Sequence, residues 1–135
     1  DADGKTQAKA LVPQLLAFGA TDIFAADRAR CVQTVKPLAE ALDTHIRTEP
    51  LLTEEGYADD PTAAWERLQK IASRDGVPVI CSQGGVIPAL LEAWAEQDGL
   101  KLPPSRNRKA STWVLSLREG QLVAADHLDS PLPRP

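Results

Sequence analysis

The spacing of apolar residues predicts that helices and strands alternate along most of the chain. Apolar residues recur three or four positions apart over residues 5–18, which indicates an amphipathic helix that Pro13 should kink or split. The same spacing predicts further helices over residues 28–42 (with a break at Pro37), 62–73 and 86–97. Short apolar runs rich in β-branched residues predict strands at residues 21–26, 44–47 and 77–81.

The last third of the chain has a different pattern. Two alternating runs, at residues 111–117 and 121–128, flank Arg118-Glu-Gly120 and predict a hairpin with a three-residue connection. Residues 49–60 are expected to connect two elements, with a helix cap at Asp60. Alternation of strands and helices over residues 21–97 favours a parallel sheet with helices on both faces. The predicted fold class is α/β, a three-layer sandwich with an antiparallel C-terminal hairpin at one edge.

Length and composition narrow the classes of function. A chain of 135 residues fits one domain, and its 43% hydrophobic and 25% charged residues are ordinary for a globular protein. A net charge of −4 argues against binding to a nucleic-acid polymer. The chain has no apolar run of about 18 residues, which argues against a membrane span. Its first residues lack the features of a signal peptide, so we expect a cytoplasmic protein.

The two cysteines, Cys31 and Cys81, fall on a predicted helix and a predicted strand. They lack C-x-x-C spacing and the chain has only two isolated histidines, so a structural zinc site is not expected. We interpret them as two buried thiols in a reducing compartment.

Residues 77–88 combine a buried strand, a glycine turn at Gly84-Gly85 and the start of a helix with Pro88 in its first turn. Such a strand-to-helix junction is where α/β proteins bind anions, because free N–H groups and the helix dipole converge there. An ordinary turn between a strand and a helix has the same pattern, and both interpretations remain open at this point.

Several known catalytic motifs are incomplete in this sequence. A cysteine phosphatase centred on Cys81 needs an arginine six positions later, where Ile87 stands. A serine hydrolase centred on Ser82 needs glycine in place of Ile80, and its partners would be Asp126 and His127, which point to opposite faces of a strand. The chain has no dinucleotide-binding glycine motif and no Walker loop.

Two stretches resemble the histidine phosphatase (phosphoglycerate mutase-like) superfamily. Residues 23–34, Ile-Phe-Ala-Ala-Asp-Arg-Ala-Arg-Cys-Val-Gln-Thr, are similar to a strand followed by the family motif S-x-x-x-R-A-x-Q-T. That match implies that Arg30 binds the phosphoryl group. Residues 79–87 resemble the family's strand ending in S-H-G-G-x-I. Ala26 and Asp27 depart from the usual residues of the first motif, with little consequence for the chemistry.

Most of the chain is also similar to the C-terminal domain of actinobacterial MutT-type Nudix hydrolases. The residues that carry this likeness are 49–52, 81–84, 86–88, 106–109, 111–116 and 125–127. The resemblance implies a Nudix domain N-terminal to this one in the parent protein. It implies no cofactor in the present domain, and Mg²⁺ or Mn²⁺ only in the linked Nudix domain.

Two departures from the family pattern bear on catalysis. The family's nucleophile is a histidine in an R-H-G or R-H-A motif on a first, central strand, which residues 1–135 lack; its second catalytic histidine is Gln83 here. The chemistry passes through a phosphohistidine, so losing the first strand removes the nucleophile, whereas glutamine only weakens charge stabilisation. We therefore expect residues 1–135 to be one domain of a longer chain, inactive on its own.

The remaining candidates have two interpretations each. Glu54 resembles the family's L-x-E general acid, but Glu55 is equally well placed and an exposed acidic turn also explains both. Arg106, Arg108 and Lys109 either form a cationic lid over phosphates or are a solvated loop.

Two functions follow from these residues. In the first, the domain serves a hydrolase of nucleoside di- or triphosphates, or of dinucleoside polyphosphates. It would bind phosphate through Arg30, Ser82, Gln83, Gly84 and the basic loop. In the second, it is a degenerate phosphatase fold that serves dimerisation or docking of the Nudix domain.

Overall fold

Three short parallel strands form the centre of the structure, a computed structural model that describes residues 2–105 and 109–132. They are β1 (Asp22–Ala26), β2 (Ile46–Glu49) and β3 (Pro78–Cys81), hydrogen-bonded in the order β2-β1-β3. The chain thus passes from β1 to β2 on one side of β1, and then from β2 to β3 on the other side of β1. Because such crossovers are right-handed, the two connections must lie on opposite faces of the sheet.

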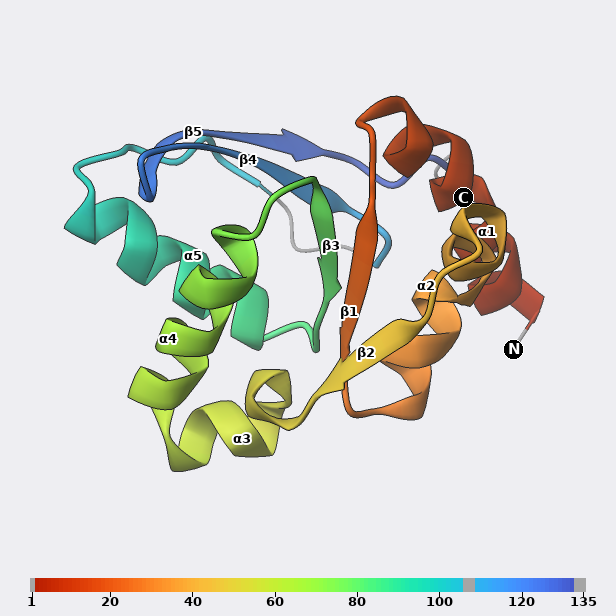
Figure 1. Ribbon diagram of the computed structural model, residues 1–135, viewed down its shortest axis with the longest axis horizontal. Coiled ribbons are helices and arrows are strands. Elements are labelled where there is room, and N and C mark those ends of the chain that lie inside the picture. Colours follow the sequence, from red (N-terminus) through yellow and green to blue (C-terminus); the bar gives the residue numbers. More distant parts are fainter. Residues whose placement is uncertain (1, 106–108, 133–135) are drawn as a thin grey trace.

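Helices occupy both sides, as that topology requires (Figure 1). The helices α1 (Ala2–Ala17) and α2 (Ala29–Leu42) pack against each other on one side. The helices α4 (Pro61–Ala72) and α5 (Val86–Gln97) lie on the other. None of the helices in the described part of the chain has the length and apolar character needed to cross a membrane.

The C-terminal strands β4 (Thr112–Arg118) and β5 (Gln121–Leu128) form an antiparallel pair of their own. The predicted fold class is confirmed, but the hairpin does not extend the parallel sheet. Within the described residues, β4 pairs only with β5 and β3 only with β1. The expected three-residue connection is also wrong. Arg118 pairs with Gln121 across the two residues Glu119 (φ 52°) and Gly120 (φ 81°), both left-handed as in a type I′ turn.

The other differences from the sequence prediction are local. Pro13 and Pro37 lie inside α1 and α2 without dividing either helix. Packing of the two helices against each other supports both across the missing hydrogen bonds. The strand β2 lies two residues later than predicted. The expected connecting segment contains a 3₁₀ turn, η1 (Pro50–Leu52), and the short helix α3 (Glu54–Asp59). Asp60 caps α4 as expected, its carboxylate accepting from the Ala63 N–H at 3.0 Å.

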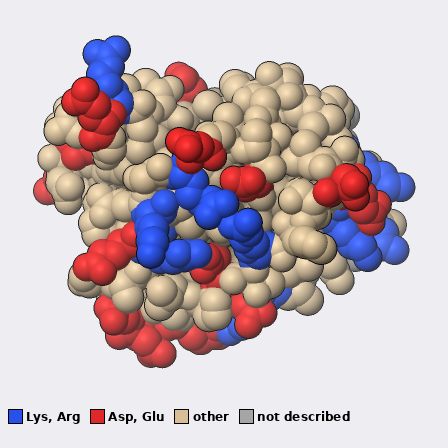
Figure 2. All heavy atoms as spheres, in the orientation of Figure 1, with Lys and Arg blue, Asp and Glu red and all other residues tan. Residues whose placement is uncertain are grey.

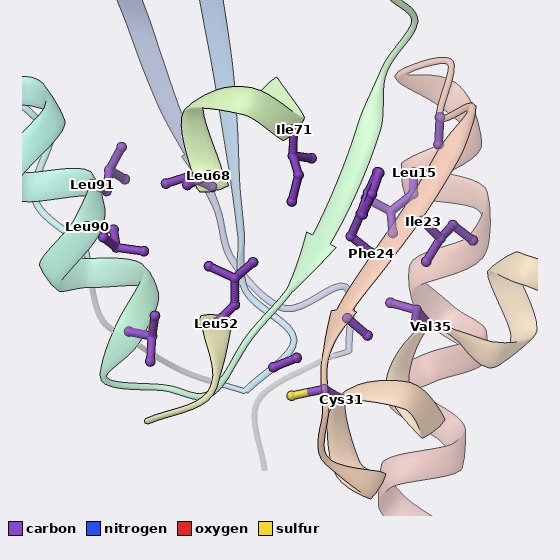
Figure 3. Packing of buried hydrophobic residues seen from close by; sticks show 14 of the residues in the cluster. Leu15, Ile23, Phe24, Cys31, Val35, Leu52, Leu68, Ile71, Leu90 and Leu91 are labelled. Atoms are coloured by element: carbon purple, nitrogen blue, oxygen red, sulfur yellow. The ribbon is translucent and has the colours of Figure 1, made fainter. Parts of the chain in front are cut away.

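The core is densest around β1, whose residues 23–26 are at most 1% exposed. Leu15 and Val35 lie beside Ile23 on the side of α1 and α2, and Leu68, Ile71 and Leu90 come from the opposite helices (Figure 3). The Phe24 ring is covered partly by charged side chains. The guanidinium carbons of Arg47 and Arg74 lie 5.6 and 5.3 Å from its centroid, over the sheet where basic side chains gather (Figure 2).

Candidate functional site

The candidate site lies where β1 and β3 end. Ala25 of β1 is the register partner of Cys81 in β3, so the segments that follow them, residues 27–30 and 82–85, leave the sheet at the same edge. This edge is at the bottom of Figure 1, beside α3 and far from the β4–β5 hairpin at the top. The residues predicted from the two separate motifs are therefore brought to one edge of the sheet.

Two arginines at the end of β1 have different environments. The Arg28 guanidinium donates to the Asp27 carbonyl at 2.7 Å and forms an ion pair with Glu55 of α3. Arg30 lies exposed in the first turn of α2, and its guanidinium has no hydrogen-bond or ion-pair partner among the described residues. Arg30 is thus the cation at this edge that remains available for an added anion.

Gln83 and Glu54 are joined by a direct contact. The Gln83 side-chain oxygen accepts a hydrogen bond from the Glu54 backbone N–H at 2.7 Å, across 29 positions of sequence. This bond uses the amide oxygen, the acceptor of the side chain, and leaves the NH₂ group, which carries its two N–H donors, to donate to a ligand. The contact also places the N-terminus of α3, with the exposed Glu54 side chain, next to the end of β3.

Ser82 makes a contact that its predicted role did not include. Its hydroxyl donates to the Leu52 carbonyl at 2.6 Å. A hydroxyl has one hydrogen, so donating to a phosphate oxygen would require Ser82 to give up this bond. Its role in phosphate binding stays a prediction, and its structural role is to tie β3 to η1.

Gly84 and Gly85 do not have the backbone conformation that only glycine tolerates. Neither is among the glycines with positive φ, and Gly85 has φ −83° and ψ −19° as the residue that caps α5. No side chain caps this helix, and a Cβ at Gly85 would meet no atom within 4 Å. The open space in front of α5 is compatible with close approach by an anion.

The basic loop is described only in part. Arg106 and Arg108 lie outside the described residues. Lys109 is exposed, and no hydrogen bond or ion pair joins it to the strand ends in the part of the chain that is described. His127 lies on β5, with its ring 5.0 Å from that of Trp113 and its Nδ1 3.9 Å from an Asp129 oxygen, so it is not part of this edge.

Two features near the strand ends were missed from the sequence. Glu49, the last residue of β2, is buried and forms an ion pair with Arg67 of α4, which lies 18 positions away. The thiols of Cys31 and Cys81 influence each other's pKa. The interaction with Cys81, aided by the positive charge of Arg28, lowers the pKa of the Cys31 thiol, whereas the interaction with Cys31 and burial raise the pKa of Cys81. A charged residue ending a strand was the available signal for Glu49, but no local pattern indicated that the two cysteines influence each other.

Comparison with known proteins shows what parts of this chain resemble. Residues 1–62 match the histidine phosphatase superfamily (branch 1). Over 131 residues, the chain is 58% identical to a protein of Mycolicibacterium smegmatis (strain ATCC 700084 / mc(2)155) named 8-oxo-(d)GTP phosphatase. That alignment covers 97% of this chain but only 41% of the relative's length. Residues 1–62, which contain β1, β2, Arg30 and Glu54, thus carry the match to the histidine phosphatase superfamily.

Proposed function

We propose that this chain is the phosphate-binding domain of a hydrolase that acts on nucleoside di- or triphosphates or on dinucleoside polyphosphates. The observation that carries the proposal is the exposed Arg30 guanidinium at the edge where β1 and β3 end, which has no hydrogen-bond or ion-pair partner within residues 2–105 and 109–132. The match of residues 1–62 to histidine phosphatases and the name of the Mycolicibacterium relative support it.

In this proposal each residue at the edge has a defined task. Arg30 supplies the positive charge that phosphoryl oxygens require, through a planar fork of N–H donors. Gln83, with its oxygen held by the Glu54 N–H, turns its NH₂ group towards the same anion. Gly85, where a Cβ would meet no atom within 4 Å, and the start of α5, which no side chain caps, leave room for close approach next to Gly84. The Glu54 carboxyl stands at the start of α3, where it can protonate a leaving oxygen.

We further propose that a strand outside residues 1–135 completes the domain and brings the nucleophilic histidine. The support is the state of two strand edges: within the described residues, β3 pairs on one side only and β4 on one side only. All four residues of β3 are partly exposed, which is unusual for a parallel strand of Pro, Val, Ile and Cys. A strand placed against β3 would end beside Arg30 and Gln83, because neighbouring parallel strands end at the same edge.

A Nudix domain preceding this one remains part of the proposal. The resemblance to MutT-type proteins supports it, and the Mycolicibacterium relative has the length for a further domain. In such a parent, the Nudix half would bind Mg²⁺ or Mn²⁺ and cleave the nucleotide, and the present domain would remove phosphate from the product.

A second candidate is a scaffold without catalysis, serving dimerisation or docking of the Nudix domain. The observation that favours it is the Gln83 contact, because the residue at the second histidine position is engaged with the backbone of α3. Arg30 argues against it, since a purely structural edge has no need of an exposed cation that is unpaired throughout the described part of the chain.

The test is phosphate release from nucleoside di- and triphosphates by the full-length gene product, compared with Arg30→Ala and Arg28→Ala. The two arginines lie in one segment, and Arg28 is already paired with Glu55, so it is the matched control. We expect Arg30→Ala to lower phosphate release by about 100-fold or more, or to leave the Nudix product unprocessed, and Arg28→Ala to change little. If Arg30→Ala leaves the amounts and kinds of product unchanged, the domain is a scaffold without a catalytic role.

A further inference from the structure

A buried ion pair stands at the start of the segment that joins β2 to α3. Glu49, the last residue of β2, is 7% exposed and is the register partner of Ala26, so it lies at the edge where β1 ends. Its Oε1 accepts one hydrogen bond from the Nε of Arg67 at 2.7 Å and a second from Nη2 of the same guanidinium. Two donors of one planar fork on a single oxygen fix the direction of the carboxylate as well as its distance from α4.

Burial of polar residues is concentrated in this segment. Among the residues that the structure describes, the buried residues with polar or charged side chains are Glu49 and Thr53. Taking a carboxylate out of water is costly, and apolar residues of similar volume often stabilise a fold as well as a buried ion pair does. Stability alone therefore does not explain the pair, and its directional geometry is the property that needs an explanation.

The turn that follows Glu49 is closely packed. The Thr53 hydroxyl donates to the Pro50 carbonyl at 2.8 Å, and a Cβ at Gly56 would collide with that same carbonyl oxygen. The turn η1 also contacts both α3 and α4. Because α3 packs against η1 without room for adjustment, a displacement of Glu49 would be carried to the start of α3.

The far end of this turn holds two side chains of the candidate site. The Ser82 hydroxyl donates to the Leu52 carbonyl at 2.6 Å, and the Glu54 N–H donates to the Gln83 side-chain oxygen at 2.7 Å. Glu54 is the first residue of α3, so its N–H has no acceptor within the helix. A continuous set of contacts thus runs from α4 through Glu49 and η1 to the amide of Gln83.

We propose that Arg67 and Glu49 are positioning residues for Gln83. Their ion pair holds the turn before α3 in the place where the Glu54 N–H fixes the Gln83 oxygen, so that the NH₂ group of the amide faces the anion at Arg30. The part of this inference that concerns the anion rests on the function proposed above. The part that concerns the contact between Glu54 and Gln83 does not, and it can be measured separately.

The first measurement is amide hydrogen exchange of Glu54 in the full-length product, because this N–H reports directly on its bond to Gln83. A double variant, Glu49→Leu with Arg67→Met, removes the ion pair without leaving an unpaired buried charge. We expect it to speed the exchange of Glu54 by about 10-fold, towards the rate in Gln83→Ala, while the amides of β1 stay protected.

Two further variants separate the ion pair from a general loss of structure. Arg28→Gln is the matched control, because it removes the exposed ion pair with Glu55 of α3 and should change the Glu54 rate by less than about 2-fold. Arg67→Lys keeps a charge opposite Glu49 but loses the two-donor fork, so we expect an intermediate rate. It decides the question if the double variant fails to fold.

Phosphate release by the same proteins tests whether the pair acts through Gln83. The double variant should lower kcat/KM by about 10-fold in the parent protein and by less than about 2-fold when Gln83→Ala is already present, because two changes that act through one group do not add. If Arg30→Ala leaves phosphate release unchanged, the proposed function fails, and the exchange measurement alone decides this inference. Equal losses of kcat/KM in both backgrounds, or parental exchange of Glu54 in the folded double variant, would overturn the positioning role.

Discussion

The strands β1 and β3 are neighbours in one sheet, yet they differ sharply in burial. Phe24 of β1 is fully buried, while its register partner Ile80 of β3 is partly exposed. Among the residues that the structure describes, β1 has a hydrogen-bonded strand on each side, and β3 has one on a single side. Hydrophobicity does not explain the difference, because β3 carries Val79 and Ile80 and β1 carries Asp22 and two alanines. Burial in this sheet follows from how many neighbours a strand has.

An edge strand made of apolar residues is a liability, because it offers unpaired N–H and C=O groups to other chains. β3 has none of the charges that usually protect such edges. The comparison therefore supports the proposal that a further strand covers β3 in the parent protein. It also ties the fold to the function, because β3 leads directly into Gln83 and Gly84.

The largest effect is expected from truncating the buried member of the pair. Phe24→Ala should lower the free energy of unfolding by about 3–5 kcal/mol, because it opens a cavity in the densest part of the core. Urea unfolding of the 135-residue chain measures this cost. A loss below about 1 kcal/mol would mean that β1 is not the centre of the core.

The cost of truncating Ile80, the register partner of Phe24, should depend on whether a further strand covers β3. Ile80→Ala should cost about 1–2 kcal/mol in the 135-residue chain, where the side chain is partly exposed, and about 2–5 kcal/mol in the full-length protein, where the proposed strand buries it. Equal costs in the two proteins would remove this support for the missing strand.

A smaller change in the free energy of unfolding is expected at Thr53, which precedes α3. The Thr53 hydroxyl accepts from the Gly56 N–H at 2.9 Å and donates to the Pro50 carbonyl at 2.8 Å, which caps α3. Thr53→Ala should cost about 1 kcal/mol, measured by urea unfolding, and Thr53→Ser should restore most of it. A full loss in the serine variant would point to the methyl group rather than to the cap.

The smallest effect is expected at the end of β1. The side chains of Arg28 and Glu55 are 42% and 67% exposed, so solvent screens their ion pair. Arg28→Gln should lower the free energy of unfolding by less than about 1 kcal/mol, and 1 M salt should abolish the difference from the parent. A larger, salt-resistant loss would show that the pair holds α3 in place.

Sequence patterns predicted the elements that bury one face. α5 has the predicted bounds, and α4 and β1 begin within one residue of the prediction, because their apolar spacing reflects contact with the core. α3 buries no residue, so it has no apolar pattern to detect. The hairpin was predicted, but not its separation from β3, because no local pattern specifies pairing between distant strands.

The candidate site was predicted unevenly for a similar reason. Motif resemblance gave Arg30 and Gln83, and the parallel topology brings their segments to one edge of the sheet. The bonds of Gln83 to Glu54 and of Ser82 to Leu52 join residues about 30 positions apart, and so they follow from tertiary structure alone.

Amide hydrogen exchange of β3 tests the central claim most directly, that a strand from outside residues 1–135 completes the edge beside Arg30. The amides of Val79, Ile80 and Cys81 would be compared in the 135-residue chain and in the full-length product, with those of Ile23 and Phe24 as internal references. We predict that the β3 amides that do not bond to β1 exchange rapidly in the chain and slow to the level of β1 in the full-length protein. Equally rapid exchange in both proteins, with β1 protected in each, would contradict the account.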